Sequence, residues 1–305
     1  MPLRFHKVIM TDLNAYLSIR ESLLNFLRED IGTGDITSNS IVRPDTYARA
    51  EITCKANEPT IVCGLDEASI IFDICKCKSK SIVSDGSLVK KGSRVLEITG
   101  NALSIMKAER TALNLIMRMS GIATETKKFR ALLDDRTTSV RIASTRKTAP
   151  GLRFLDKKAV AIGGGETHRM RLDDMVLIKD NHIPLAGSVE KAIEHARKKI
   201  GKSIKLECEA TNLAEAIVAV NAGADSVMLD NFSPAAVART IEELSRRGIR
   251  HKAKIEVSGG IRLRNIKSYA KAKPDIISIG YLTHSPKAAD FSLEVIETKE
   301  NEISY

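Results

Sequence analysis

The segment that decides the fold is SVMLDNFSPAAVARTIEELSRRGIRHKAKIEVSGGIRLRNIKSYAKAKPDIISIG, residues 226–280. Three short apolar runs in it, Ser226 to Leu229, Ile255 to Val257 and Ile276 to Ile279, are separated by two stretches with helical spacing, Pro234 to Arg247 and Leu263 to Lys273. Short apolar runs that alternate with helices are typical of repeated β/α units around a parallel sheet. The segment therefore predicts an α/β fold.

The same alternation extends upstream, at intervals of roughly 20 to 30 residues. The further apolar runs are Val140 to Ala143, Ala159 to Ile162, Met175 to Ile178 and Ile204 to Leu206. Seven units are compact for a barrel, which typically has eight strands. An incomplete seven-stranded α/β barrel of the TIM type and an open doubly wound sheet are both compatible with this count.

The N-terminal part of the chain has a different pattern. Apolar spacing predicts a helix over Asp12 to Arg28, and a period of two between Arg49 and Gly100 predicts a β-rich module with a strand over Ile70 to Lys76. Leu103 to Asp135 should form two helices separated near Ser120-Gly121. We therefore expect a smaller N-terminal domain before the β/α units.

Polar clusters follow each apolar run of the second half. They are Ser144 to Lys147, Gly163 to Gly165 with His168 and Arg169, Lys179 to His182, Glu207 with Glu209, Asp230-Asn231, Ser258 to Gly260, and Gly280. The carboxyl ends of parallel strands meet at one rim of the sheet, where ligands bind. A single Arg or Glu at such a position is usually a solvated loop residue, but a functional group at every strand end predicts one shared site.

The residue types in these clusters indicate the ligand chemistry. Glycine turns after the last two strands expose backbone N–H groups, which suit a phosphate. Glu209 and Asp230 suit a hard cation such as Mg²⁺, which carboxylates and substrate phosphates commonly hold together. A cationic floor for carboxylates or pyrophosphate would come from Arg146, Lys147, His168, Arg169 and Lys179.

Composition narrows the class of partner. The net charge is +10, from 48 Lys and Arg against 38 Asp and Glu, and such an excess favours anionic partners. The basic residues are spread along the chain and lack the tails or interleaved aromatics that nucleic-acid binding usually leaves. We therefore expect anionic metabolites rather than nucleic acid.

The expected compartment is the cytoplasm. Five cysteines without a CxxC pair are most simply free thiols of a reduced protein. No apolar run approaches membrane-spanning length and no leader pattern is present at the start of the sequence, so no membrane association is expected.

Several of these motifs, taken in order, resemble the quinolinate phosphoribosyltransferase family, the carboxylating nicotinate-nucleotide pyrophosphorylases. The motifs are Glu29 to Asp35, Ala108 to Asn114, Ser120 to Thr124, Thr145 to Arg153, Gly163 to Arg169, Leu177 to His182, Leu229 to Asn231, Ser258 to Gly260 and Gly280 to Ser285. Each tripeptide alone is a weak signal, whereas the ordered set spans nearly the whole chain and is specific.

The resemblance implies a fold and a reaction. The fold would be an N-terminal α/β sandwich domain, residues 1–114 joined by the C-terminal tail 286–305, and an incomplete seven-stranded α/β barrel over residues 115–285. The reaction would join quinolinate and phosphoribosyl pyrophosphate with Mg²⁺, giving nicotinate mononucleotide, pyrophosphate and CO₂. The assembly would be a homodimer with shared active sites, which a trimer of dimers could extend to a hexamer.

The resemblance also implies a role for each matched residue. Arg110 would reach quinolinate in the partner's site, while Thr145, Arg146, Lys147, His168, Arg169 and Lys179 would line the substrate pocket. Lys147 and Lys179, with Glu209 and Asp230 on the ribose and Mg-pyrophosphate, would be catalytic. Ser258, Gly259 and Gly260, with Ser278, Ile279 and Gly280, would hold the 5′-phosphate. In the Glu207-Cys-Glu209 pair the second carboxylate falls on the family's position.

Other activities remain as alternatives. Ala143-Ser144 and Glu166-Thr167 depart mildly from the family's commonest pattern, and a molybdate-associated or a nicotinate-specific paralogue would share the scaffold. A phosphosugar isomerase or lyase in a barrel would need a lone catalytic base and would release no pyrophosphate. A nucleic-acid-binding protein that used the positive charge would show a steep salt dependence of binding.

Overall fold

The computed structural model describes residues 13–133, 139–201 and 203–300, so Asp12 and residues 134–135 of the expected helices lie outside the described part. Contacts between residues divide the chain into two units. The described residues of Met1–Glu125, Ala161–Gly163 and Pro286–Tyr305 form unit 1, and those of Thr126–Val160 and Gly164–Ser285 form unit 2. The boundary predicted between residues 114 and 115 falls inside a single helix, α5 (Ala102–Ala131).

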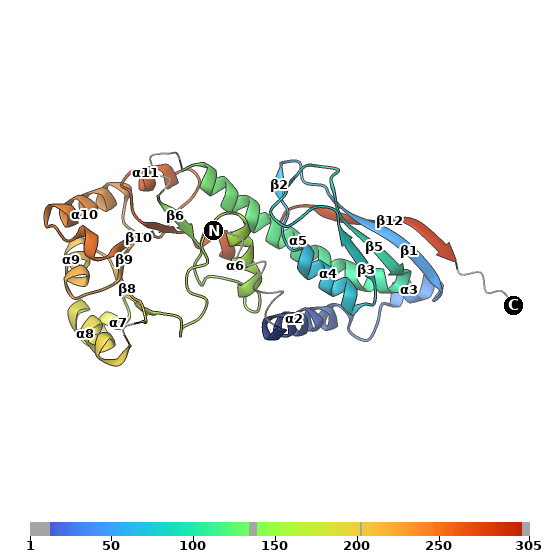
Figure 1. Ribbon diagram of the computed structural model, residues 1–305, viewed down its shortest axis with the longest axis horizontal. Helices are drawn as coiled ribbons and strands as arrows, with labels where there is room; N and C mark the ends of the chain where they lie inside the picture. The colour runs from blue at the N-terminus through green and yellow to red at the C-terminus, as the bar shows by residue number, and fades with distance from the viewer. Residues whose placement is uncertain (1–12, 134–138, 202, 301–305) are drawn as a thin grey trace. The chain divides into compact units, whose positions relative to one another are not determined.

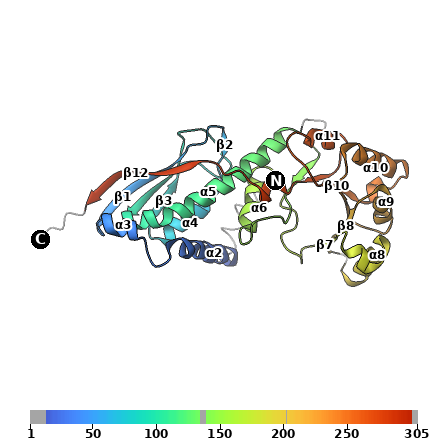
Figure 2. The same ribbon diagram turned by 180° about the vertical axis from the view of Figure 1, so that it is seen from behind.

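Unit 1 is built on an antiparallel sheet with helices against it (Figures 1 and 2). The strand order is β12-β1-β5-β3, with bounds β12 (Phe291–Glu300), β1 (Thr46–Cys54), β5 (Arg94–Asn101) and β3 (Lys78–Ser81). Ala48, Ala50, Ile52 and Cys54 of β1 are buried at alternate positions, so one face of the strand enters the core. The remaining elements are α2 (Leu13–Ile31), α3 (Ile36–Ile41), α4 (Leu65–Ile74), and the strand pair β2 (Thr60–Ile61) and β4 (Leu88–Val89).

Two expectations for this unit are wrong. The run Ile70 to Lys76 belongs largely to α4, whose first turn carries Asp66 and Glu67 where acidic side chains favour a helix. The helix α5 runs without interruption through Gly121. A Cβ at Gly121 would collide with the backbone carbonyl oxygen of Lys287, so this glycine allows a close backbone approach rather than a break in the helix.

Unit 2 is built on a parallel sheet, as predicted. The strand order is β6-β11-β10-β9-β8-β7, with bounds β6 (Arg141–Ala143), β11 (Ile276–Ser278), β10 (Lys254–Ser258), β9 (Ser226–Asp230), β8 (Leu206–Ala210) and β7 (Val176–Ile178). The last strand, β11, pairs with the first, β6. This order matches a barrel in which the chain returns on itself, and it excludes the order reversal of a doubly wound sheet.

The seventh expected strand lies elsewhere than predicted. Ala159 to Ile162 forms the end of α6 (Arg153–Ile162), and the seventh parallel segment is a single bridge between Glu166 and Ala143. Within the described residues no ladder joins Glu166 to β7. The barrel is therefore incomplete, as expected, and its gap lies between Glu166 and β7.

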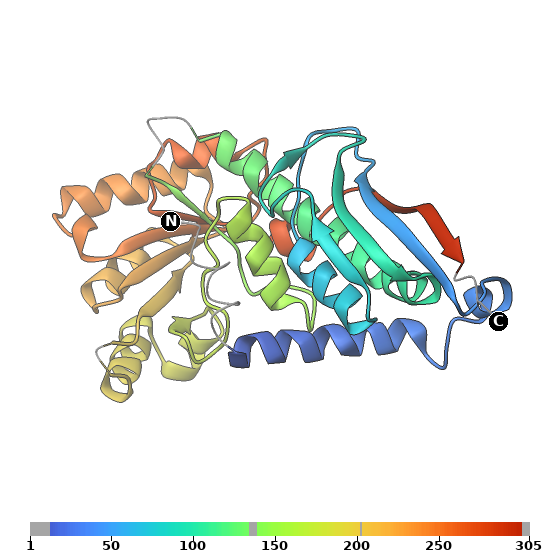
Figure 3. The ribbon, with the colours of Figure 1, turned by 45° about the vertical axis from the view of Figure 1, so that its right-hand side comes forward.

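Helices cover the outside of the parallel strands (Figure 3). They are α8 (Val189–Lys199), α9 (Leu213–Asn221), α10 (Pro234–Arg246) and α11 (Ile266–Ala270), and the shorter elements of the unit are α7 (His182–Ala186), the 3₁₀ turn Arg250–Lys252 and α12 (Tyr281–His284). Ser188, Asn212 and Ser233 cap α8, α9 and α10 by accepting backbone N–H bonds. In the part of the chain that the structure describes, every helix is too short or too polar to span a lipid bilayer.

Candidate active site

A cavity of about 430 Å³ lies at the carboxyl ends of the parallel strands in unit 2. Its lining residues are Ser144, Thr145, Arg146, Lys147, His168, Arg169, Leu177, Lys179, Asp180, Glu209, Met228, Asp230, Glu256, Ser258 and Ser278. They come from every strand of the sheet or from the loop that follows it. The strand ends therefore converge on one site, the arrangement that the polar clusters predicted.

Most residues predicted for the site line this cavity. Those that do so are Thr145, Arg146, Lys147, His168, Arg169, Lys179, Glu209, Asp230, Ser258 and Ser278. Gly259, Gly260, Ile279 and Gly280 lie in the adjoining turns. Arg110 is on α5 in unit 1, with a side chain that is 58% exposed.

The loop after β6 is fixed by contacts with the last β/α turn. The Thr283 hydroxyl donates to the carbonyl oxygen of Lys147 at 2.8 Å, and the backbone N–H of Lys147 donates to the hydroxyl of Thr145 at 3.1 Å. A Cβ at Gly280 would lie 3.2 Å from Cδ of Lys147. The small residue at 280 thus leaves room for the Lys147 side chain at the cavity wall.

Lys179 and Glu209, which both line the cavity, form an ion pair. Lys179 Nζ lies 2.8 Å from Glu209 Oε1, with the lysine side chain 45% exposed and the glutamate side chain only 10% exposed. The backbone N–H of Lys179 donates to Nδ1 of His182 at 2.8 Å, which fixes the position of the loop after β7. Both charges are consequently held at the cavity before any ligand binds.

Asp230 is oriented by the residue that follows it. Asn231 has φ of 56°, a left-handed conformation that asparagine tolerates, and its Nδ2 donates to Asp230 Oδ2 at 2.7 Å. Gly259 has φ of 95°, and a Cβ there would lie 2.8 Å from the backbone nitrogen of Asn231. Only glycine fits at position 259, which lets the turns after β9 and β10 pack closely.

His168 lines the cavity and lies between two buried carboxylates. Its Nε2 is 3.3 Å from Glu207 Oε2 and 3.2 Å from Glu256 Oε2, and both glutamate side chains are 1% exposed. Burial alone would lower the pKa of His168, but the interactions with Glu207 and Glu256 raise that pKa to about 10. The histidine is therefore an imidazolium at neutral pH and part of the cationic floor.

The other cations of the floor lack a full complement of anions. Burial and the nearby charge of Arg146 lower the pKa of Arg169, and Nε of Arg146 is buried without a hydrogen-bond acceptor among the described residues. Buried donors of this kind are normally satisfied in the functional state. The site is consequently suited to an anionic ligand that supplies the missing acceptors.

Glu209 and Asp230 offer the donor set that a hard divalent cation prefers. Both carboxylates line the cavity, and the Asn231 amide engages Asp230 Oδ2 only, which leaves Oδ1 for another partner. Oxygen ligands from one or two carboxylates, completed by substrate oxygens, are the usual environment of Mg²⁺. The residues present therefore fit this metal.

Sequence reasoning did not single out Glu256, Leu177 or Met228 as lining residues, and it placed Ser144 and Asp180 in the polar clusters without giving them a role. Glu256 stands in the middle of β10, where alternation of polar and apolar residues favours a solvated side chain. The signal that could have found it is that a second carboxylate, Glu207, also stands inside a strand.

Comparison with known proteins gives consistent results along the chain. The model of the quinolinate phosphoribosyl transferase N-terminal domain matches residues 35–120, and the model of the C-terminal domain matches residues 122–294. A probable nicotinate-nucleotide pyrophosphorylase [carboxylating] of Methanothermobacter thermautotrophicus is 42% identical over 272 residues, which cover 88% of this chain and 96% of that protein.

The nicotinate-nucleotide pyrophosphorylase [carboxylating] of Rattus norvegicus is 37% identical over 253 residues, covering 81% of this chain and 82% of that protein. Among solved structures, the nicotinate-nucleotide pyrophosphorylase from Francisella tularensis is 38% identical, with a TM-score of 0.83, and the match covers 91% of this chain and 96% of that one.

Proposed function

Since the chain belongs to the quinolinate phosphoribosyltransferase family, we propose that it transfers the phosphoribosyl group of phosphoribosyl pyrophosphate to quinolinate. The products would be nicotinate mononucleotide, pyrophosphate and CO₂, a step of NAD biosynthesis. The observation that carries the proposal is the cavity of unit 2, in which five cationic side chains and four carboxylates, Glu209 and Asp230 among them, converge at the strand ends.

Quinolinate carries two carboxylates on adjacent ring carbons, and the cationic floor supplies its partners. Arg146, Lys147, His168, Arg169 and Lys179 all line the cavity. Arginine can bind a carboxylate through two parallel N–H bonds, and lysine acts as a point charge. These contacts would hold the pyridine nitrogen toward the ribose, which turns a bimolecular encounter into an oriented one.

The turns after β10 and β11 would hold the 5′-phosphate. The backbone N–H groups of Gly259, Gly260 and Gly280 donate no hydrogen bond to any described residue, and Ser258 and Ser278 line the cavity beside them. Free N–H groups in a glycine turn form a nest for an anion, and the corresponding turns of barrels commonly hold phosphate. Ile279 would contribute through its backbone.

The chemical step would be a loose displacement at the anomeric carbon of the ribose. As pyrophosphate leaves, positive charge grows on the ribose, and Glu209 and Asp230 would stabilise it from the cavity wall. A Mg²⁺ ion held by these two carboxylates would neutralise charge on the departing pyrophosphate.

The cationic floor lowers the repulsion between the two anionic substrates, which in water amounts to ~1 kcal/mol for each pair of charges a few ångströms apart. Loss of CO₂ then leaves an electron pair on the ring carbon next to the nitrogen, which the positive pyridinium stabilises. The protein must hold geometry and admit a proton to that carbon.

The assembly and the location are part of the same proposal. Arg110 in unit 1 is exposed, and a guanidinium in that position is available to a second copy of the chain. We therefore propose a homodimer with shared active sites, with a hexamer as a trimer of dimers. The proposed location is the cytoplasm.

Turnover of quinolinate compared with nicotinate tests the proposal. Both pyridines would be supplied in turn with phosphoribosyl pyrophosphate and Mg²⁺, and nicotinate mononucleotide would be measured by chromatography. We expect product from quinolinate and at least a hundredfold less from nicotinate, because the dianion uses more of the cationic floor. Preferred use of nicotinate would reject the proposal in favour of the nicotinate-specific paralogue.

A further inference from the structure

The main chain around His168 is held by a lysine that has no contact with solvent. Lys157 of α6 is completely buried, and its Nζ donates to the carbonyl oxygen of Arg169 at 2.8 Å and, through a short hydrogen bond, to that of Thr167. These two carbonyls flank His168, whose φ of 52° is unfavourable for a residue with a Cβ. Lys157 thus stabilises a left-handed backbone conformation at His168 that costs free energy.

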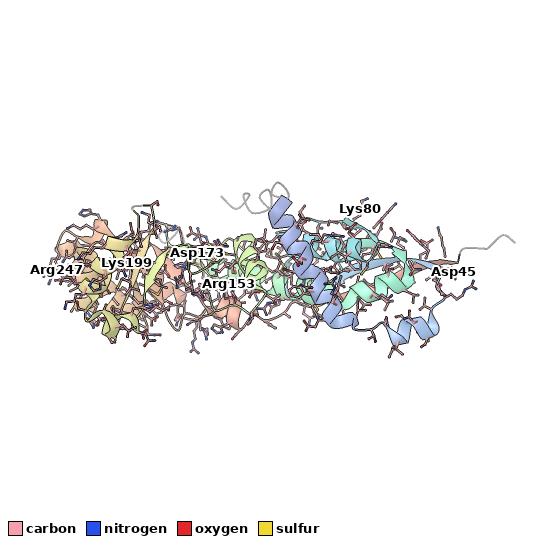
Figure 4. All side chains as sticks on the ribbon, turned by 90° about the horizontal axis from the view of Figure 1, so that it is seen from below. Asp45, Lys80, Arg153, Asp173, Lys199 and Arg247 are labelled. Atoms are coloured by element: carbon pink, nitrogen blue, oxygen red, sulfur yellow. The ribbon has the colours of Figure 1, made fainter. Side chains whose placement is uncertain are left out.

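The surroundings of Lys157 are predominantly cationic. Burial and the neighbouring charge of Arg153 lower the pKa of Lys157 to about 8. Arg153, the first residue of α6, also donates to the carbonyl oxygen of Met170 at 3.2 Å, and the following loop carries Asp173 (Figure 4). Burying an ammonium among arginines costs free energy unless the ammonium is hydrogen-bonded. The hydrogen bonds of Lys157 go to the main chain of the 167–170 segment, which points to a role in shaping that segment.

Two serine–glutamate pairs hold the ring of His168. Ser226 donates to Glu207 Oε1 at 3.0 Å, and Ser278 donates to Glu256 Oε1. The second oxygen of each carboxylate faces Nε2 of His168, and neither has an aligned hydrogen bond among the described residues. One N–H shared by two oxygens is aligned with neither, so the two carboxylates together hold the ring between them.

Nδ1 of His168 remains as the free donor of the ring. It has no hydrogen-bond partner among the described residues, and the His168 side chain, 12% exposed, lines the cavity. Burial and the charge of Glu207 raise the pKa of Glu256, while the interactions with both glutamates raise the pKa of His168. The pair therefore favours a charged ring, whose second N–H can donate a charge-assisted hydrogen bond to a carboxylate. A fixed donor loses little entropy when a ligand binds.

We propose that Lys157 and Glu256 are positioning residues that hold His168 as a fixed cationic donor, and that this framework determines the preference for a pyridine dicarboxylate over a monocarboxylate. The inference rests on the proposed function, because it assigns the specificity of that same site. Neither residue was singled out from the sequence. Lys157 does not line the cavity, and Glu256 acts through His168.

The test measures how the wild type and two variants discriminate between two ligands. Dissociation constants of quinolinate and nicotinate would be measured by isothermal titration calorimetry for the wild type, Glu256→Gln and Lys157→Met. Glutamine keeps the shape and an acceptor for Ser278 but removes the charge, and methionine keeps the length of lysine without its N–H donors. We expect quinolinate to bind 10- to 100-fold more weakly to each variant, with the nicotinate constant changed less than threefold.

Matched controls separate positioning from general destabilisation. Glu67→Gln removes a carboxylate that is 2% exposed in unit 1, and Lys158→Met removes an equally buried ammonium at the next position of α6. Both should lower the melting temperature without changing the ratio of the two dissociation constants. An unchanged ratio in Glu256→Gln and Lys157→Met, or an equal change in the controls, would overturn the proposal.

The outcome is distinguishable from failure of the proposed function. A wild-type protein that does not convert quinolinate would reject the function itself. A wild-type protein that converts quinolinate, with variants that bind both ligands in the wild-type ratio, would reject only the positioning role.

Discussion

Replacement of Lys179 by alanine should abolish most of the activity while leaving the fold intact. The ammonium lies 2.8 Å from Glu209, but its side chain is 45% exposed, and a partly solvated ion pair contributes about 0–1 kcal/mol to stability. One charged contact that strengthens in the transition state is worth about 2–4 kcal/mol, which corresponds to a loss of roughly 30- to 1,000-fold in kcat/KM. Lys147→Ala should behave in the same way.

The assay would follow nicotinate mononucleotide at saturating and limiting quinolinate, with unfolding by urea measured in parallel. Lys55→Ala is the matched control, because Lys55 of unit 1 forms a comparable pair with Glu294 at 2.6 Å, its side chain is 37% exposed, and it is not among the residues that line the cavity. The control should retain full activity. A folded Lys179→Ala protein within threefold of wild-type turnover would refute the role given to this residue.

Three other predictions concern packing, pH and assembly. Gly121→Ala should destabilise the protein by about 1–3 kcal/mol in urea unfolding, because the new methyl would meet backbone, whereas the same change inside an unobstructed helix stabilises by about 1 kcal/mol; a stabilised variant would contradict this reading. Burial alone would raise the pKa of Asp225, but the hydrogen bond from Arg197 and those from its neighbours lower it to about 2. The carboxylate therefore stabilises the fold above its unfolded pKa of about 3.9, so Asp225→Asn should cost about 1 kcal/mol at pH 6 and progressively less as the pH falls from about 4 to 2; a constant difference would argue against it. Inactive Arg110→Ala and inactive Lys179→Ala chains, mixed and reassembled, should recover part of the activity, and no recovery despite proven subunit exchange would place Arg110 in its own chain's site.

The convergence of the site could be predicted because it follows from topology. In a parallel sheet the residues after each strand must lie at the same edge, so Lys147, Lys179, Glu209 and Asp230 are brought to one cavity wherever the helices pack. The sequence itself shows that these residues are charged. Their roles in binding and catalysis stay predictions until they are measured.

The wrong assignments have a common physical cause. A run of four to seven apolar residues can be a buried strand or the buried face of a helix, and its periodicity alone does not distinguish them. Both runs are helix ends: Ile70 to Lys76 has one face against a core, and Ala159 to Ile162 ends a helix whose residues 155–161 are all buried. His168 and Arg169 were still placed at the site, because the parallel bridge at Glu166 precedes them directly.

Contacts between residues far apart in the sequence explain why Gly121 and Glu256 were interpreted differently from the sequence. Nothing near Gly121 in the sequence shows that the segment before β12 passes against it, so the glycine suggested a helix break. Glu256 alternates with apolar neighbours as a solvated strand residue would, and its burial depends on His168, which is far away in the chain. The exposed basic side chains that raise the net charge, such as Lys199 and Arg247 on unit 2 (Figure 4), lie apart from the cavity.

The central claim is tested most directly by the stoichiometry of the reaction. Quinolinate labelled in the carboxyl group next to the ring nitrogen would be incubated with phosphoribosyl pyrophosphate and Mg²⁺, and labelled CO₂, nicotinate mononucleotide and pyrophosphate would be quantified together. We expect the three products in equal amounts and none of them when either substrate is omitted. Pyrophosphate release without CO₂, or a mononucleotide that retains both carboxylates, would contradict the account.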